Sequence, residues 1–529
     1  MRLFEKRMAE IKLSGSFINL SVLIRILYIL VLTVIPTKVC PQNITPSKKG
    51  MTKIEILHSD IMEQNIVIDP DLTRFLGNVK IKHKDVLMYC DSAYYYNSKN
   101  QVKAYSKIHI EQGDTLNLFG NYLFFDGTTE QAFVKGNVEL IDKETHLFND
   151  SVNYDVHNKI ARYNNRGRIT NAENTLTSII GVYYASENLF HFKDSVKIVN
   201  PKYVITADTM DYNTITETSF FTGPTELKGD SLYLYCEKGW YDTKKDITSL
   251  WKKALIDNKQ QVITGDSLFF DKVTGYGKSY RNVTIKDSAN NVLVKGNYAW
   301  YYKQPERFMI TQRAMFIQVS NNDSLFLHAD TISAITVSDS SLKEYRLMKA
   351  YYGCRIFSKD LQAKCDSLSY SFQDSVIRLY RSPVLWSEEN QLTSDTMAVF
   401  TKNRQTDHME LYNSAFITSK IDTVRFNQIK GRNLTGYFKN NELYKIDIRG
   451  NGEAIYYLLD GENIAGRNQT KCANIMVYVE KGKIQEIYEY KDPEGVIDPP
   501  EPFLPDPLRL KGFNWFDSMR PKKKADLFN

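Results

Sequence analysis

The stretch Ala207-Asp208-Thr209-Met210-Asp211-Tyr212 contains a pattern that recurs along the chain: Asp, then Ser or Thr, then an apolar residue, any residue, and a second apolar residue. Copies begin at Asp91, Asp150, Asp208, Asp266, Asp330, Asp366 and Asp395, with degenerate copies at Asn121, Glu237, Asn297 and Arg432. Successive copies lie roughly 30 residues apart, and a fixed period of this size predicts a stacked repeat architecture.

The two apolar residues of each copy lie on the same side of a strand, because side chains along a strand alternate with a period of two. Each unit therefore predicts a strand with one apolar face. The residues predicted to form this interior face are Ala93, Tyr95, Leu123, Phe125, Val152, Tyr154, Met210, Tyr212, Leu268, Phe270, Leu368 and Tyr370.

The composition favours the same fold class. Aromatic residues make up 12% of the chain, with 34 Tyr and 27 Phe, and aromatic side chains pack well on pleated surfaces. The Asp-Ser/Thr pair predicts a bend, because its oxygens hydrogen-bond the local backbone. Gly-Asn in Phe75–Val79 and Phe133–Val138 predicts turns between strands. We expect an all-β fold, an elongated open jellyroll or solenoid-like stack of short antiparallel strands.

The two ends of the chain differ from the repeat region. Basic residues and then the apolar run Ile26–Ile35 predict an export signal at 1–42, either cleaved or retained as an anchor. The repeats occupy 43–491. Residues 492–529 read as a Pro-rich linker and a basic tail, in which Gly512–Phe516 is either a docking segment or part of a disordered terminus.

The positions of the cysteines and histidines indicate packing roles and not metal binding or catalysis. Four cysteines directly precede an Asp position, which favours a small packed residue over a metal ligand; they are Cys90, Cys236, Cys365 and Cys472. Cys354 and Cys365 are either a hairpin disulfide or two buried thiols. The eight histidines form no close-spaced ligand set, and no nucleophile motif occurs. We predict no catalytic residue, metal or cofactor.

The charge distribution narrows the set of partners. Lys and Arg number 68 against 62 Asp and Glu, and this small excess is spread along the chain. Nucleic-acid binding needs a basic stripe with interleaved aromatic residues. We therefore expect no nucleic-acid partner.

An export segment followed by many short strands with Gly-Asn-Val turns and the Ala207–Tyr212 motif resembles the OstA-like family, over roughly Glu55 to Glu480. That family includes periplasmic bridge proteins of lipopolysaccharide transport. The resemblance implies a non-enzymatic periplasmic protein, free or held at a membrane through its N-terminus or its partners. The twelve interior residues would then line an apolar groove for lipopolysaccharide or a related lipid.

The sequence leaves two questions undecided: what the apolar rows form, and which partners bind. The apolar rows can equally form a filled core, as in a scaffold or adhesin-like solenoid, and an outer-membrane barrel also alternates apolar and polar residues. Partners implied by the resemblance are envelope transport proteins or a second copy. They would dock by strand pairing at the edges predicted near Ile54–Met62 and Ile475–Glu480.

Overall fold

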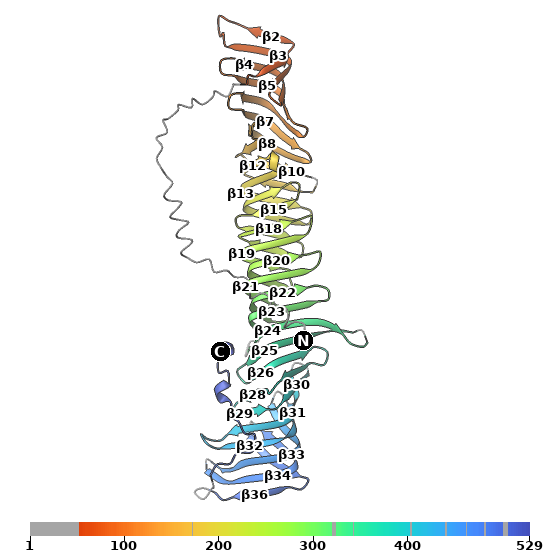
Figure 1. The fold of residues 1–529 in the computed structure, drawn as a ribbon, viewed down its shortest axis with the longest axis vertical. Coiled ribbons are helices and arrows are strands. Elements are labelled where there is room, and N and C mark those ends of the chain that lie inside the picture. Colours follow the sequence, from red (N-terminus) through yellow and green to blue (C-terminus); the bar gives the residue numbers. More distant parts are fainter. Residues whose placement is uncertain are drawn as a thin grey trace, which may run out of the picture. The chain divides into compact units, whose positions relative to one another are not determined.

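The computed structural model describes residues 52–529 apart from 172, 320–323, 342, 403–404, 440–441, 462, 481–482 and 501–505. Lys53–Asn529 form one unit in which antiparallel strands stack in chain order (Figure 1). The all-β prediction is confirmed. The predicted export segment at 1–42 lies outside the described residues.

The first half of the stack contains β1 (Glu55–His58), β2 (Ile61–Gln64), β3 (Leu72–His83), β4 (Val86–Tyr96), β5 (Gln101–Gln112), β6 (Leu116–Asp126), β7 (Gln131–Asp142), β8 (Thr145–Asp155), β9 (Ile160–Tyr163), β10 (Gly167–Thr170), β11 (Thr175–Ser178), β12 (Ile180–Tyr184), β13 (Leu189–Asn200), β14 (Tyr203–Asn213), β15 (Thr218–Phe221), β16 (Thr225–Gly229), β17 (Tyr233–Cys236) and β18 (Lys238–Asp242). The 3-10 helix η1 (Ala185–Glu187) follows β12.

The second half contains β19 (Ile247–Asp257), β20 (Gln261–Asp271), β21 (Tyr276–Asp287), β22 (Val292–Tyr302), β23 (Arg307–Gln318), β24 (Leu325–Ser338), β25 (Glu344–Phe357), β26 (Gln362–Ser371), β27 (Val376–Tyr380), β28 (Val384–Ser387), β29 (Asn390–Thr393), β30 (Thr396–Lys402), β31 (Gln405–Lys420), β32 (Phe426–Lys439), β33 (Glu442–Asp460), β34 (Asn463–Glu480), β35 (Lys483–Tyr490) and β36 (Glu494–Asp498). The 3-10 helices η2 (Asp517–Met519) and η3 (Lys524–Phe528) follow.

The long strands bend in their middle at a bulge. In the β3–β4 pair, Leu76 lies opposite Ser92 and Val79 opposite Cys90. Gly77 and Asn78 therefore stand opposite Asp91 alone, and such a two-against-one mismatch bends a strand. The predicted Gly-Asn turns between strands are wrong, because a left-handed pair fits a mid-strand bulge as well as a hairpin end.

The same left-handed pair recurs along the stack, with φ between 47° and 85°. The pairs are Gly77–Asn78, Ser106–Lys107, Gly136–Asn137, Asp194–Ser195, Lys252–Lys253, Arg281–Asn282, Gln312–Arg313, Arg381–Ser382, Asn413–Ser414, Gly450–Asn451 and Lys491–Asp492. Elsewhere the bend is a break between two short strands, as between β9 and β10.

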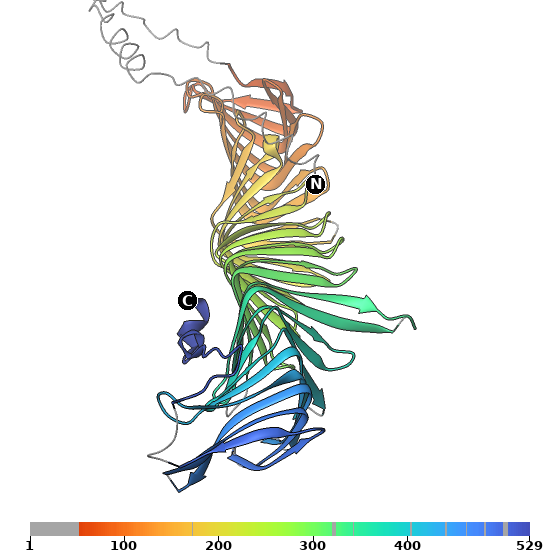
Figure 2. The ribbon, with the colours of Figure 1, turned by 60° about the horizontal axis from the view of Figure 1, so that its bottom comes forward.

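The bends divide the sheet into two walls that face each other. We call wall 1 the part formed by residues before the Asp position of each marked strand and by their strand partners. Wall 2 is the part formed by residues after the Asp position of each marked strand and by their strand partners. The hydrophobic core lies between the walls and consists of alternate residues of both. Figure 2 shows the strands turning along this line of bends.

Several aspartates at the repeat position, and Asp60 one period before Asp91, bind the bend of the following strand. The Asn78 amide donates to Asp60 at 3.0 Å, and the Asn282 amide donates to Asp266 at 3.1 Å. Lys107 pairs with Asp91 at 3.4 Å, and Arg381 with Asp366 at 3.3 Å. In the first three contacts the donor is the second residue of a left-handed pair, and in the fourth it is the first residue of the pair Arg381–Ser382.

The residue before the Asp position lies inside the bend, where there is little room. A Cβ added to Gly120 would lie 2.4 Å from Val134 Cγ1, and one added to Gly431 would lie 2.3 Å from Ile448 Cγ2. Cys90, Cys236, Cys365 and Cys472 occupy the same position and are buried free thiols. Cys354 stands opposite Cys365 across β25 and β26, and it too is a free thiol.

We expect Gly120→Ala to lower the free energy of unfolding by about 1–3 kcal/mol, because Val134 must move to admit the methyl group. Gly277→Ala is the control. Its added Cβ would lie 3.4 Å from the nearest atom, an ordinary contact, and should change stability by less than about 0.5 kcal/mol. Equal losses in urea unfolding would show that space inside the bend does not select small residues.

Candidate functional site: an interior that changes from closed to open

Two rows of side chains from wall 2 face the interior. The inner row consists of the residues two places after each Asp position and their cross-strand partners. It runs next to the bend through Met210, Leu268, Ala299 and Leu368, among others. Its members are buried along the stack. The rim row consists of the residues four places after each Asp position together with their cross-strand partners, and it lies farther from the bend. Because the two walls diverge from the bend, the contacts of the rim row show whether the free margins of the walls meet.

In the N-terminal part of the stack, tyrosines of the rim row reach across to wall 1. The Tyr154 hydroxyl donates to Gln112 Oε1 at 2.5 Å, and the Tyr183 hydroxyl donates to Asp142 Oδ2 at 2.6 Å. Asn171 Nδ2 donates to the Tyr212 hydroxyl at 3.2 Å. These three bonds repeat at the period of the units, and each ties the free margin of wall 2 to that of wall 1.

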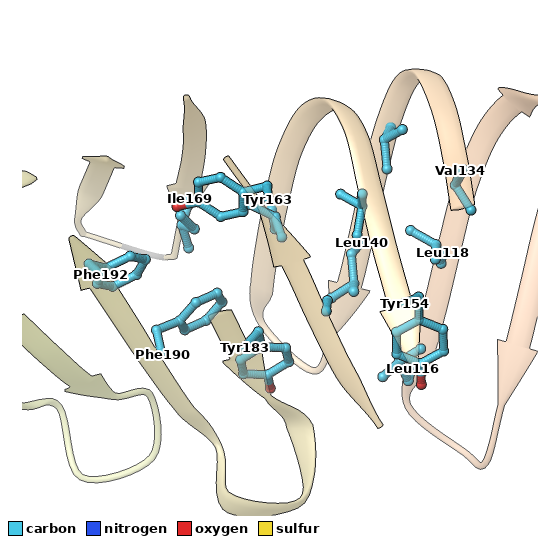
Figure 3. Close-up of a cluster of buried hydrophobic side chains, with 14 of the residues drawn as sticks. Leu116, Leu118, Val134, Leu140, Tyr154, Tyr163, Ile169, Tyr183, Phe190 and Phe192 are labelled. Atoms are coloured by element: carbon cyan, nitrogen blue, oxygen red, sulfur yellow. The ribbon is translucent and has the colours of Figure 1, made fainter. Parts of the chain in front are cut away.

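Aromatic and aliphatic side chains fill the space behind these tyrosines. The Tyr183 and Phe190 rings stack with centroids 4.2 Å apart, and Phe190 stacks on Phe192 at 5.2 Å. Figure 3 shows these rings beside Tyr163 and Ile169, with Leu118, Val134 and Leu140 farther along the same interior. This part of the stack, from β3 to β14, is the closed segment. Its interior is a packed core.

Burial keeps the bonding tyrosines protonated. Burial is the main cause that raises the pKa of Tyr154 and of Tyr183, and the bond to Asp142 raises the pKa of Tyr183 further. Burial also raises the pKa of Tyr163 to about 12. A neutral hydroxyl is the form that can donate a hydrogen bond to a carboxylate.

The hydrogen bonding between the two walls changes after Tyr212. The next rim residue, Tyr241, donates its hydroxyl to Asp246 in the hairpin loop of its own wall, at 2.7 Å. The following one, Phe270, has no hydroxyl. From there the rim row is only half-buried, through Phe270, Tyr301, Phe308, Met348 and Tyr370.

Wall 1 carries half-buried apolar side chains opposite this stretch, namely Ile256, Ile263, Ile285 and Phe316. The inner row beneath them stays buried, with Leu268 at 2% exposure and Ile310 at 0%. We call β20 to β26 the open segment. Its green hairpins project outward from the line of bends in Figure 2. Half-buried apolar side chains of both walls therefore lie over a buried floor, and we call this half-buried stretch the trough.

The interior is closed again toward the C-terminal end. Ile446 and Val477, which continue the rim row, are buried. Glu489 of β35 accepts bonds from Thr470 Oγ1 at 2.9 Å and Asn468 Nδ2 at 3.3 Å, both in the wall 1 part of β34. This polar contact joins the two walls at the C-terminal end of the stack.

The structure places the twelve predicted interior residues on the interior face. Eight belong to the packed core of the closed segment, with only Tyr95 half-buried; they are Ala93, Tyr95, Leu123, Phe125, Val152, Tyr154, Met210 and Tyr212. Leu268 and Leu368 belong to the buried floor, and Phe270 and Tyr370 to the margin of the open segment. The pattern missed Phe308, Phe316 and Ile285, because they stand on strands that carry no Asp signal.

The predicted C-terminal edge is wrong. Ile475 pairs with Glu489 and Val477 pairs with Ile487, so Ile475–Glu480 is an internal strand. The last strands are β35 and β36, which both pair with β34. At the other end, β1 and β2 pair with β3, and Ile61 and Met62 are exposed.

Among the residues that the structure describes, no group of three or more His, Cys, Asp and Glu could hold a metal ion. A depression of about 560 Å³ lies on the outer face of wall 2 near Tyr345, Ser369 and Arg378, away from the trough. Within the described ranges, no helix is both long and apolar enough to span a bilayer.

The N-terminal part of the repeat region is similar to a known family. Residues 51–208 match the family model of OstA-like proteins, which confirms the resemblance for this stretch. The match covers most of the closed segment and ends just before Tyr212. No curated protein matches the chain.

We expect Tyr183→Phe to lower the free energy of unfolding by about 1–3 kcal/mol, because it leaves the buried Asp142 carboxylate without its donor. Exposed Tyr352→Phe is the control and should be neutral. A neutral Tyr183→Phe would contradict the role of the tyrosine bond in closing the walls.

Alkaline pH should weaken the closed segment. The pKa values of Tyr154 and Tyr183 are higher in the folded protein than the value of about 10 in an unfolded chain. Their contribution is therefore complete below pH 10 and is lost progressively above it. Urea unfolding between pH 8 and 11.5 should show a smaller loss for the double variant Tyr154→Phe/Tyr183→Phe than for the unmodified chain. Parallel pH profiles would contradict this assignment.

Proposed function

We propose that this protein binds lipid in the cell envelope and holds acyl chains in the trough of the open segment, as a component of lipopolysaccharide or related lipid transport. The observation that carries the proposal is the half-buried apolar margin over a buried floor, bounded by closed parts on both sides. The OstA-like match supports an envelope role, although the trough lies beyond the matched residues.

The dimensions of the trough suit an acyl chain. It crosses seven strands, from β20 to β26, which corresponds to about 30 Å at a strand spacing of ~4.8 Å. An acyl chain lying along it gains about 0.8 kcal/mol for each buried methylene. Phe270, Phe308 and Phe316 would lose their remaining contact with water at the same time. Binding of this kind requires apolar surface and no catalytic group.

The ends of the surrounding hairpins suit a charged lipid headgroup. Lys259 in the β19–β20 turn and Lys303 in the β22–β23 loop are exposed. They flank the trough at the free margins of wall 1 and wall 2. A phosphate-bearing headgroup at the surface of the trough would lie within reach of such ammonium groups.

A structural scaffold is the second candidate, and the packed core of the closed segment favours it. In that case the trough would bind nothing. The rival proposals therefore differ in what occupies the space beside Phe270.

Photo-crosslinking from two adjacent residues separates them. Phe269 and Phe270 are both half-buried and point to opposite faces of β20. With p-benzoylphenylalanine in cells, we expect a lipid adduct from position 270 and none from position 269. Lipid adducts at neither position, or equally at both, would contradict binding in the trough.

Charge placed at the margin should separate binding from folding. Phe308 and Ile310 lie on the same face of β23, but Phe308 is half-buried and Ile310 is at 0% exposure. Phe308→Glu should abolish lipid copurification at a cost of about 1 kcal/mol, whereas Ile310→Glu should cost several kcal/mol. Full lipid retention in a folded Phe308→Glu variant would count against the proposal.

A further inference from the structure

The C-terminal segment Asp506–Asn529 packs on the outer face of wall 1 without joining the sheet. Its only regular elements are η2 and η3. The segment runs back along the stack, from Arg467 of β34 to Phe326 and His328 of β24. The dark blue end of the chain lies beside these strands in Figures 1 and 2.

A row of buried glutamines on this face contacts the segment. Gln362, Gln391 and Gln428 stand on β26, β29 and β32, with exposures of 4%, 1% and 0%. They lie on one line across the sheet, because Trp386 pairs with the first two and Thr418 pairs with the second and third. Their side chains point away from the interior, since the neighbouring Ile429 and Leu385 belong to the core.

Two of the glutamines bind the segment in the same way. Gln428 donates from Nε2 to the Leu508 carbonyl at 2.9 Å, and its Oε1 accepts from the Leu510 amide at 2.9 Å. Gln391 donates to the Asn514 carbonyl at 2.7 Å, and its Oε1 accepts from the Phe516 amide at 2.7 Å. Each side-chain amide therefore brackets backbone groups two residues apart, as a neighbouring strand would.

Side-chain contacts add selectivity to this backbone recognition. Leu510 is buried in a cluster with Phe416, Ile455 and Tyr457. The Phe513 and Trp515 rings lie 5.3 and 5.0 Å from the Phe426 ring. Farther along, Arg520 Nε donates to Gln362 Oε1 at 2.8 Å.

The last residues of the segment sit on strands of the open segment. Leu527 is fully buried, and its carbonyl accepts a bond from Arg355 at 3.3 Å. The Phe528 ring lies 4.4 Å from the His328 ring, and the Arg313 guanidinium lies 4.4 Å from its centroid. These contacts are to β23, β24 and β25.

We propose that the glutamine row is a peptide-binding site and that Asp506–Asn529 is its ligand, bound in cis as a separable strap. The ligand class is an extended segment with an apolar residue, then aromatic residues, then an arginine, at the spacing of Leu510, Phe513 to Phe516 and Arg520. Because the segment makes no ladder bonds with the sheet, it can leave and rebind while the stack stays folded.

Cleavage of the full chain tests this directly. A protease site replaces residues 501–505, and the cut protein is passed over a size-exclusion column. We expect the fragment to stay with the body and to exchange with a fluorescein-labelled synthetic peptide of residues 506–529. Gln391→Ala and Gln428→Ala should each weaken peptide binding about tenfold, since each removes two hydrogen bonds. Gln101→Ala on β5 is the control and should have no effect.

Peptide variants keep the test valid if the glutamine substitutions impair folding. Methylation of the backbone nitrogens of Leu510 and Phe516 removes the two donors to the glutamines, whereas methylation at Lys511 and Asp517 is the control. The first peptide should bind the unmodified cut protein at least tenfold more weakly than the control. Release of the fragment only on global unfolding, or equal binding of both peptides, would overturn the proposal.

Release of the strap should also affect the trough; this expectation rests on the proposed function. Release should speed hydrogen exchange in β24 and β25 and weaken lipid retention. A change in exchange without a change in lipid retention would leave the peptide site standing and count against lipid binding.

Discussion

Many of the long strands place two consecutive left-handed residues opposite the single residue at the Asp position of a neighbouring strand, and this mismatch bends the strand at its midpoint. A small residue inside the bend lets the two halves approach, and at several units an Asp carboxylate also binds a side chain of the following strand. Without the bend, one continuous sheet would present an apolar face to water. With it, the same sheet supplies both walls and buries that face against itself. The stack, its interior and its margins all follow from this local geometry.

The state of the interior depends on what the rim row carries. A tyrosine is long enough to cross from wall 2 to wall 1, and its hydroxyl can bond to Gln112 or Asp142 there. Phe270 lacks that hydroxyl, and the Tyr241 hydroxyl is already bonded to Asp246. One backbone plan thus provides a packed core in one part and an apolar trough in another. The difference lies in a few side chains and needs no change in topology.

The sequence predicts the repeat, the all-β class and the interior face, because the Asp signal and the two-residue alternation are both local. It misplaces the Gly-Asn pairs, since a left-handed pair has the same signature in a bulge and in a hairpin turn. Whether the walls meet cannot be derived from local pattern. Tyr154 reaches Gln112, which lies 42 residues earlier in the chain, and nothing near either residue indicates the contact.

The last strands and the contacts of the C-terminal segment could not be predicted from local sequence either. The repeat pattern stops at Lys491, because the sequence after it is rich in Pro and acidic residues, yet β35 and β36 extend the sheet beyond the predicted edge at Ile475–Glu480.

 The recognition of Leu508–Phe516 by Gln391 and Gln428 is also long-range, since 80 or more residues separate the partners. Single buried glutamines in strands carry no sequence signal of their own.

If the margins of the walls are joined in the closed segment and separate in the open one, the distances between their hairpin ends should differ between the two segments. Spin labels on the hairpin ends test this expectation through electron–electron distance measurements in the full chain. One pair is placed at Lys143 and Asn188, whose side chains are in contact at 2.8 Å, and the other at Lys259 and Lys303, the corresponding hairpin ends of the open segment. We predict a short distance for the first pair that does not change with lipid, and a longer distance for the second pair that shifts when lipid is added. Equal short distances in both pairs, with no response to lipid, would contradict the account.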